Sequence, residues 1–193
     1  MEFLAKSISN LFIRWSNLPF SNDEIEVFYY GTECFLNSFF TFVVLCVWGI
    51  ISDTLIPTTS WLTVFCIYRH HAGGPHANTN MRCIAASSLL GMSNYIALSV
   101  SAIVLRYRVL ITIIILTVCI FIVPFKSTKK ILSKKDSLIE KLLSIAIVLF
   151  VIILSLVFEP KIAVSILYAL LVANLLIVIA SAGSLFHKIA NKH

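Results

Sequence analysis

Long runs of apolar residues alternate with short polar segments along this chain. A transmembrane helix needs about 20 apolar residues, within a usual range of about 17–25. Runs as continuous as these exclude a transmembrane β-barrel, whose strands would alternate apolar and polar side chains. We therefore predict an all-α bundle of six spans, five of them clear and one short, at residues 55–68. The five clear runs are residues 34–52, 84–105, 107–124, 142–158 and 162–182.

The first twenty residues follow a different pattern. Leu4, Ile8, Leu11 and Trp15 recur every three or four residues, and polar side chains occupy other positions. This spacing predicts an amphipathic helix that either lies in the membrane interface or packs on the bundle. We interpret residues 1–30 as an interfacial N-terminal segment.

The composition agrees with a membrane protein and excludes several other classes. The 193 residues are 59% hydrophobic and 12% charged, whereas soluble domains are about 45–50% apolar and about 25% charged. So few charges exclude a soluble enzyme, a disordered chain and a disulfide-stapled secreted module. No repeat or flexible linker divides the sequence. We therefore expect one membrane-embedded domain over residues 1–193.

The net charge of +6 is explained by membrane topology. Lys and Arg residues near transmembrane helices concentrate on the cytoplasmic side. With six spans and both termini in the cytoplasm, most basic residues fall inside, and only Arg106, Arg108 and Lys161 fall outside. Segment 69–83 and the basic loop 125–141 then both face the cytoplasm. The lipid bilayer is the expected partner, and no nucleic acid is expected.

Residues 68–83 concentrate the side chains that could perform chemistry. They hold three of the five histidines, two of the six glycines and Cys83, whereas the other cysteines lie in apolar stretches. A thiol becomes a nucleophile when a base takes its proton or when positive potential favours the thiolate. Asn78, Thr79 or Asn80 is suited to cap the following helix. Cys83 would then lie in its first turns, where the helix dipole favours a thiolate.

His76 lies seven residues before Cys83 and is the candidate base. In one continuous helix the two side chains would be about 10 Å apart along the axis, which is beyond hydrogen-bond reach. A Cys–His pair therefore requires non-helical backbone between them. Gly73, Gly74 and Pro75 are suited to make this bend, because glycine permits positive φ and proline blocks helix continuation.

Two other interpretations of this segment stay open from the residues alone. A metal site would use His70, His71, His76 and Cys83, although no standard ligand spacing is present. A non-enzymatic membrane binding or transport component would use the same loop to hold a lipid headgroup, another ligand or a metal. For a catalytic site, the nearest acids along the chain are Asp53 and Asp136, and no third triad member is evident. Asn78, Asn80 and Asn94 are candidates to orient His76, and nothing in the sequence selects among them.

The segment resembles the active-site region of the AgrB (accessory gene regulator B) family, membrane cysteine endopeptidases of Gram-positive quorum sensing. Two further features agree with this resemblance. One is a loop in which Pro124 is followed by Lys126, Lys129 and Lys130, and the other is Glu159-Pro160 between the last two spans. The matching residues are Arg69, Gly73-Gly74, His76-Ala77-Asn78-Thr79 and Cys83.

The resemblance implies an enzyme that cleaves the C-terminal tail from an AgrD-type propeptide. Cys83 would be the nucleophile and His76 the base, and the acyl-enzyme thioester would pass to a Cys or Ser of the substrate, forming a cyclic thiolactone or lactone. The resemblance also implies a cell-membrane protein of a Gram-positive bacterium that forms a homodimer and needs no cofactor or metal. Arg69, Gly73, Gly74 and Asn78 would support the site.

The basic loop has two interpretations. Lys129, Lys130, Lys134 and Lys135 would dock an acidic propeptide tail or anionic lipid. They would otherwise serve only as a topology determinant.

Overall fold

The structure, a computed structural model, describes residues 2–16, 20–74, 79–125 and 134–190. Every regular element within these ranges is an α-helix, which confirms the predicted all-α class. The elements are α1 (Glu2–Ser16), α2 (Asn22–Ile51), α3 (Leu55–Ala72), α4 (Asn80–Met92), α5 (Asn94–Ser99), α6 (Ser101–Arg106), α7 (Arg108–Ile122), α8 (Lys134–Val157) and α9 (Pro160–Ala190).

Among the residues that the structure describes, three helices are long and apolar enough to cross a membrane. They are α2, α8 from Lys135 onward, and α9 as far as Gly183. Helix α7 is apolar but shorter. Large apolar side chains such as Phe150, Leu156 and Ile179 remain exposed on α8 and α9, as expected of surfaces that face lipid.

The apolar run 84–105 does not form one helix, so this part of the prediction is wrong. The chain is helical over α4, α5 and α6, with interruptions at Ser93 and Val100. At the first interruption, the Ser93 hydroxyl donates to the carbonyl oxygen of Leu90 at 2.6 Å. Ser and Asn side chains compete in this way with backbone hydrogen bonds. Asn94 then donates to Ser165 of α9 at 3.0 Å, which fastens the segment to the core.

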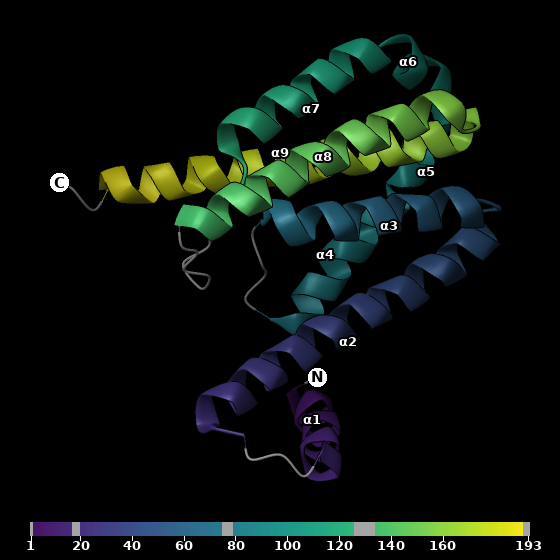
Figure 1. Ribbon diagram of the computed structural model, residues 1–193. Coiled ribbons are helices and arrows are strands. Elements are labelled where there is room, and N and C mark those ends of the chain that lie inside the picture. The colour runs from purple at the N-terminus through teal and green to yellow at the C-terminus, as the bar shows by residue number, and fades with distance from the viewer. Residues whose placement is uncertain (1, 17–19, 75–78, 126–133, 191–193) are drawn as a thin grey trace.

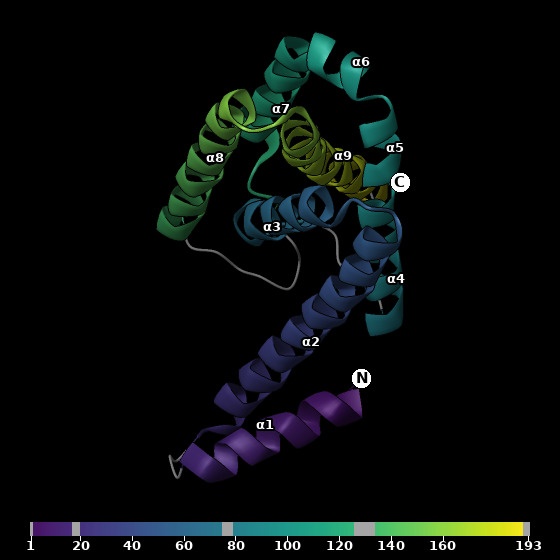
Figure 2. The same ribbon diagram turned by 90° about the vertical axis from the view of Figure 1, so that its right-hand side faces the viewer.

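Helices α3 and α9 form the centre of the core. In Figure 2, α3 lies between α8 and α4, and it contacts both of them as well as α9. Trp61 and Tyr68 of α3 are fully buried, and the Tyr68 hydroxyl donates to Asn174 Oδ1 at 3.0 Å. Asn174 in turn donates to the carbonyl oxygen of Leu170 at 2.8 Å. An amide within an apolar helix is costly to expose to lipid, so the sequence predicts that Asn174 points inward, and the structure confirms this.

Helix α1 and the first half of α2 extend away from the remaining helices (Figure 1). Helix α1 packs on α2 through its small residues, since Ala5 and Ser9 are buried and Ser9 donates to Thr32 at 2.9 Å. Its large apolar side chains stay outside, with Phe3 82% and Trp15 81% exposed. The predicted N-terminal helix is therefore present. It packs on α2, and its exposed aromatic residues are of the kind that suits a membrane interface.

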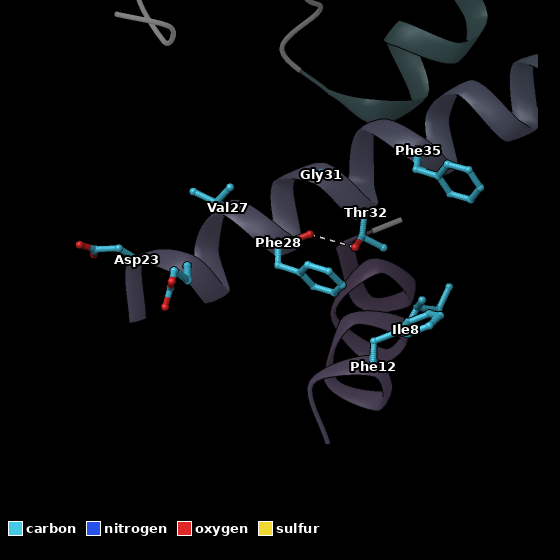
Figure 3. Close-up of a pocket in the computed structure, with 9 residues that line it drawn as sticks. Ile8, Phe12, Asp23, Val27, Phe28, Gly31, Thr32 and Phe35 are labelled. Carbon is cyan, nitrogen blue, oxygen red and sulfur yellow. Dashed lines mark hydrogen bonds between the residues drawn. The ribbon is translucent and has the colours of Figure 1, made fainter. Parts of the chain in front are cut away.

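A cavity of about 760 Å³ opens between α1 and α2 (Figure 3). Asp23 and Glu24 lie beside it, and the rest of its lining is almost entirely apolar. None of its lining residues is a cysteine, histidine or lysine. The cavity therefore holds none of the residues of the predicted Cys–His site. The lining consists of Ile8, Phe12, Asp23, Glu24, Val27, Phe28, Gly31, Thr32 and Phe35.

Candidate functional site

The candidate site begins where α3 ends. Ala72 is the last helical residue, and Gly73 and Gly74 follow with φ of 78° and 150°. A Cβ on Gly73 would lie 2.7 Å from the carbonyl oxygen of Phe125, and one on Gly74 would lie 3.0 Å from Arg69 Nη2. Gly73 therefore needs glycine by conformation and by space, and Gly74 needs it by conformation. The helix stops where the sequence predicts the bend, although Pro75 lies outside the described residues.

Cys83 lies at the capped N-terminus of α4. Thr79 is the N-cap: its side chain accepts from the Arg82 amide at 3.4 Å, and its carbonyl accepts from the Cys83 amide at 3.0 Å. The Cys83 side chain is half-buried. Of the three N-cap residues that the sequence allows, the structure selects Thr79. It also confirms that Cys83 lies in the first turns, where a helix N-terminus favours negative charge.

A positive charge lies on the α3 side of Cys83. The Arg69 guanidinium interacts electrostatically with the thiols of Cys83 and Cys66, and it stacks over the Phe65 ring at 5.4 Å. Burial lowers the pKa of Arg69, while the two thiols act in the opposite direction. Arginine remains charged under all ordinary conditions. The structure therefore brings together Arg69, Gly74 and Cys83 of the predicted set.

Helix α2 forms the other side of this region, which the sequence analysis did not foresee. Asn37 Nδ2 donates to Asn80 Oδ1 at 3.1 Å, and this bond joins the middle of α2 to the first residue of α4. Tyr30 and Cys34 are close enough to Cys83 to interact with it electrostatically. The signal that could have revealed this face is the spacing of Tyr30, Cys34 and Asn37, which places polar groups on one stripe of an apolar helix.

His71 belongs to a different contact. Its Nδ1 lies 2.7 Å from Glu140 Oε2 of α8, and this pair links α3 to α8. Residues two apart on a helix point about 200° away from each other, so Arg69 and His71 face opposite sides of α3. Glu140 is an acidic partner that is not evident from the sequence, because it lies 69 residues from His71, whereas Asp53 and Asp136 are the acids nearest to the segment along the chain.

The predicted base, His76, and the supporting Asn78 lie outside the described residues. His70 is exposed and meets the His71 ring edge-on at 5.0 Å between centroids. Within the part of the chain that the structure describes, no three His, Cys, Asp or Glu side chains gather where they could hold a metal ion.

Both ends of the basic loop lie beside the end of α3. The Phe125 amide donates to the carbonyl oxygen of Ala72 at 2.9 Å, and Glu140 pairs with His71. Lys129 and Lys130 lie outside the described residues. Lys134 and Lys135 begin α8, where the Lys135 side chain is exposed. The segment after Gly74 and the basic loop therefore emerge from the same end of the bundle.

This arrangement predicts the result of a topology experiment. Reporter fusions truncated after Gly74 and after Lys135 should register on the same side of the membrane, and the positive charge predicts the cytoplasmic side. A fusion after Glu159, beyond the long apolar helix α8, is the control and should register on the opposite side. Signals from opposite sides for the first two fusions would contradict the arrangement.

Comparison with known proteins gives one finding. Residues 5–182 match the family model described as Accessory gene regulator B. No curated protein and no solved structure matches the chain.

Proposed function

Because this chain belongs to the accessory gene regulator B family, we propose that it is a membrane cysteine endopeptidase that matures an AgrD-type propeptide in quorum sensing. Family membership suggests a role in processing the agr signal peptide. The observation that carries the finer proposal is the position of Cys83, half-buried at the capped start of α4 with Arg69 beside it. A thiol held by a helix N-terminus and a fixed cation has the surroundings of a nucleophile.

The proposed reaction proceeds by acyl transfer. His76 takes the proton of Cys83, and the sulfur attacks the carbonyl carbon of the scissile bond. A C–S bond forms, and the carbonyl π electrons move to oxygen. When the C=O bond is restored, the C–N bond breaks and the departing amine takes the proton from His76. A Cys or Ser side chain of the bound propeptide then gives its proton to His76 and attacks the thioester carbonyl. The C–S bond to Cys83 breaks, the peptide ring closes, and the released thiolate takes the proton back from His76.

The supporting residues have separate roles in this scheme. Arg69 places positive potential beside the sulfur and the oxyanion that forms next to it. Gly73 and Gly74 allow the chain to leave α3 past Phe125 and Arg69 without a clash. The roles of His76 and Asn78 come from the resemblance. Backbone N–H groups at the start of α4 are the expected oxyanion donors.

We also propose that the basic loop holds the acidic tail of the propeptide. The hydrogen bond from Phe125 to Ala72 and the His71–Glu140 pair support this, because they place both ends of the loop beside the segment that leads to Cys83. Lys129, Lys130, Lys134 and Lys135 would attract acidic side chains on the tail. The resemblance further indicates a homodimer in a Gram-positive cell membrane, with the site on the cytoplasmic side.

A trapping experiment tests the covalent step. Purified protein is mixed with a synthetic propeptide and quenched in acid, and its intact mass is measured. We expect an adduct that equals the N-terminal fragment of the propeptide, located on Cys83 and released by hydroxylamine. Release of the tail with an adduct on another cysteine would overturn the assignment. Binding of the propeptide without adduct or cleavage would favour the alternative, a non-enzymatic binding or transport component.

A further inference from the structure

The polar contact between α2 and α4 contains a hydrogen-bond donor that nothing described in the structure uses. Asn80 Oδ1 accepts from Asn37 Nδ2 at 3.1 Å. A side-chain amide also carries an NH₂ group with two donors, and Nδ2 of Asn80 has no hydrogen-bond partner among the described residues. The bond to Asn37 fixes the plane of the Asn80 amide and so fixes the direction in which this NH₂ group points.

Asn80 shares a helix face with Cys83. It is the first residue of α4, and Cys83 follows three residues later. Residues three apart on a helix have Cβ atoms about 5–6 Å from each other, so their side chains are neighbours. Asn80 is also only partly buried, which leaves its amide accessible to a substrate bound at the thiol.

The surroundings of Asn37 indicate that the contact is specific. Asn37 lies on a largely apolar helix, and its own Oδ1 is buried without a hydrogen-bond partner among the described residues. Farther along the same two helices, a Cβ on Gly91 would lie 2.5 Å from Leu45 Cδ1, so α2 and α4 approach closely there. This close packing holds the two helices in register. Burial of a polar group costs free energy unless it is hydrogen-bonded. The bond to Asn80 offsets part of this cost for the Asn37 amide, and it also positions the Asn80 side chain.

We propose that the Asn80 side chain is an oxyanion-binding group of the Cys83 site and that Asn37 positions it; this inference rests on the proposed function. When the Cys83 sulfur adds to the scissile carbonyl, the oxygen gains negative charge within reach of the first turn of α4. The Asn80 NH₂ group then donates a hydrogen bond to that oxygen without transferring a proton. The oxyanion collapses to the thioester, and the amine leaves with the proton from His76. A fixed side-chain amide lowers the barrier in this way because it needs no reorganisation during the reaction.

The experiment compares Asn80→Ala with Asn22→Ala in the full-length protein. Asn22 is a matched control, because it is the first residue of α2 after the cap Ser21 and lies exposed. Removal of one oxyanion donor costs about 10²–10³-fold in kcat. We expect a loss of this order for Asn80→Ala, with KM and the rate of Cys83 alkylation by iodoacetamide close to the parent values. Asn22→Ala should retain the parent kcat.

A peptide aldehyde distinguishes this catalytic role from a structural one. Such an aldehyde forms a tetrahedral adduct with a thiol, so its affinity should fall with Asn80→Ala in proportion to kcat. Asn80→Gln should recover part of both. Asn37→Ala should lower kcat in the parent protein but have little further effect once Asn80 is alanine, because coupled residues are not additive.

Two outcomes separate this inference from the proposed function. Parent kcat in Asn80→Ala, together with an inactive Cys83→Ala protein, would overturn the role of Asn80 alone. A Cys83→Ala protein that still cleaves the propeptide would overturn the proposed function and the inference with it. A kcat loss without weaker aldehyde binding would also remove the oxyanion role.

Discussion

Replacement of Cys83 by alanine is expected to abolish propeptide cleavage. Removal of a catalytic nucleophile lowers kcat by several orders of magnitude, because the remaining groups have no acyl acceptor to assist. We expect a loss of at least about 10⁴-fold, measured as tail release from a synthetic propeptide by liquid chromatography. The substitution removes little volume at a half-buried position, so the thermal unfolding midpoint in detergent should stay close to that of the parent protein.

The matched control for this experiment is Cys66→Ala. Cys66 is exposed on α3, and its thiol interacts with the same Arg69 guanidinium as Cys83 does. Only Cys83, however, stands at the capped start of a helix. Cys66→Ala should therefore cleave the propeptide at about the parent rate. Equal activity of the two variants would contradict the assignment of Cys83 as the nucleophile.

Replacement of Gly73 by alanine should both destabilise the protein and impair processing. Gly73 has a φ of 78°, and an L-residue with a side chain costs roughly 1–2 kcal/mol in the left-handed region. The new Cβ would also lie 2.7 Å from the carbonyl oxygen of Phe125, a backbone atom that can yield only if the chain moves. We expect the free energy of unfolding to fall by at least about 2 kcal/mol. Cleavage should fall more than about tenfold, because a misplacement of about 1 Å can cost about 10²-fold.

Gly183→Ala provides the comparison for Gly73→Ala. Gly183 lies within α9, and beyond the local backbone of that helix a Cβ there would meet no described atom within 4 Å. Alanine is favoured over glycine inside a helix by roughly 0.5–1 kcal/mol, so this variant should be neutral or slightly more stable. Equal unfolding midpoints for the two variants would show that the bend at Gly73 tolerates a side chain and would contradict the tight approach to Phe125.

The features that the sequence predicts correctly depend on short stretches of chain. The helical class follows from the apolar runs, and the end of α3 follows from Gly73 and Gly74. The start of α4 follows from the three capping candidates at residues 78–80, of which Thr79 is the N-cap. Each signal lies within a few residues of its effect. The inward orientation of Asn174 is likewise predictable, because a lone amide in an apolar helix has only one favourable direction.

The features that it misses depend on contacts between distant segments. Asn37 and Asn80 are 43 residues apart, and His71 and Glu140 are 69 residues apart. No local pattern specifies which helices will meet, so neither pair is evident in one sequence. The break at Ser93 was missed for another reason. A count of apolar residues over 84–105 does not register one serine hydroxyl that competes for a backbone carbonyl.

The interrupted course of residues 80–106 also bears on where a product of the proposed chemistry would be released. Helix α4 has 13 residues and is therefore about 20 Å long, whereas the hydrocarbon layer is about 30 Å thick. Helix α4 by itself is thus too short to cross that layer, and Cys83 lies in its first turn, at the end that follows the segment after Gly74. With the segment after Gly74 on the cytoplasmic side, as the positive charge predicts, a peptide ring closed at Cys83 would be released on that side. Export of a mature signal would then be a separate crossing of the membrane that starts from the cytoplasmic side.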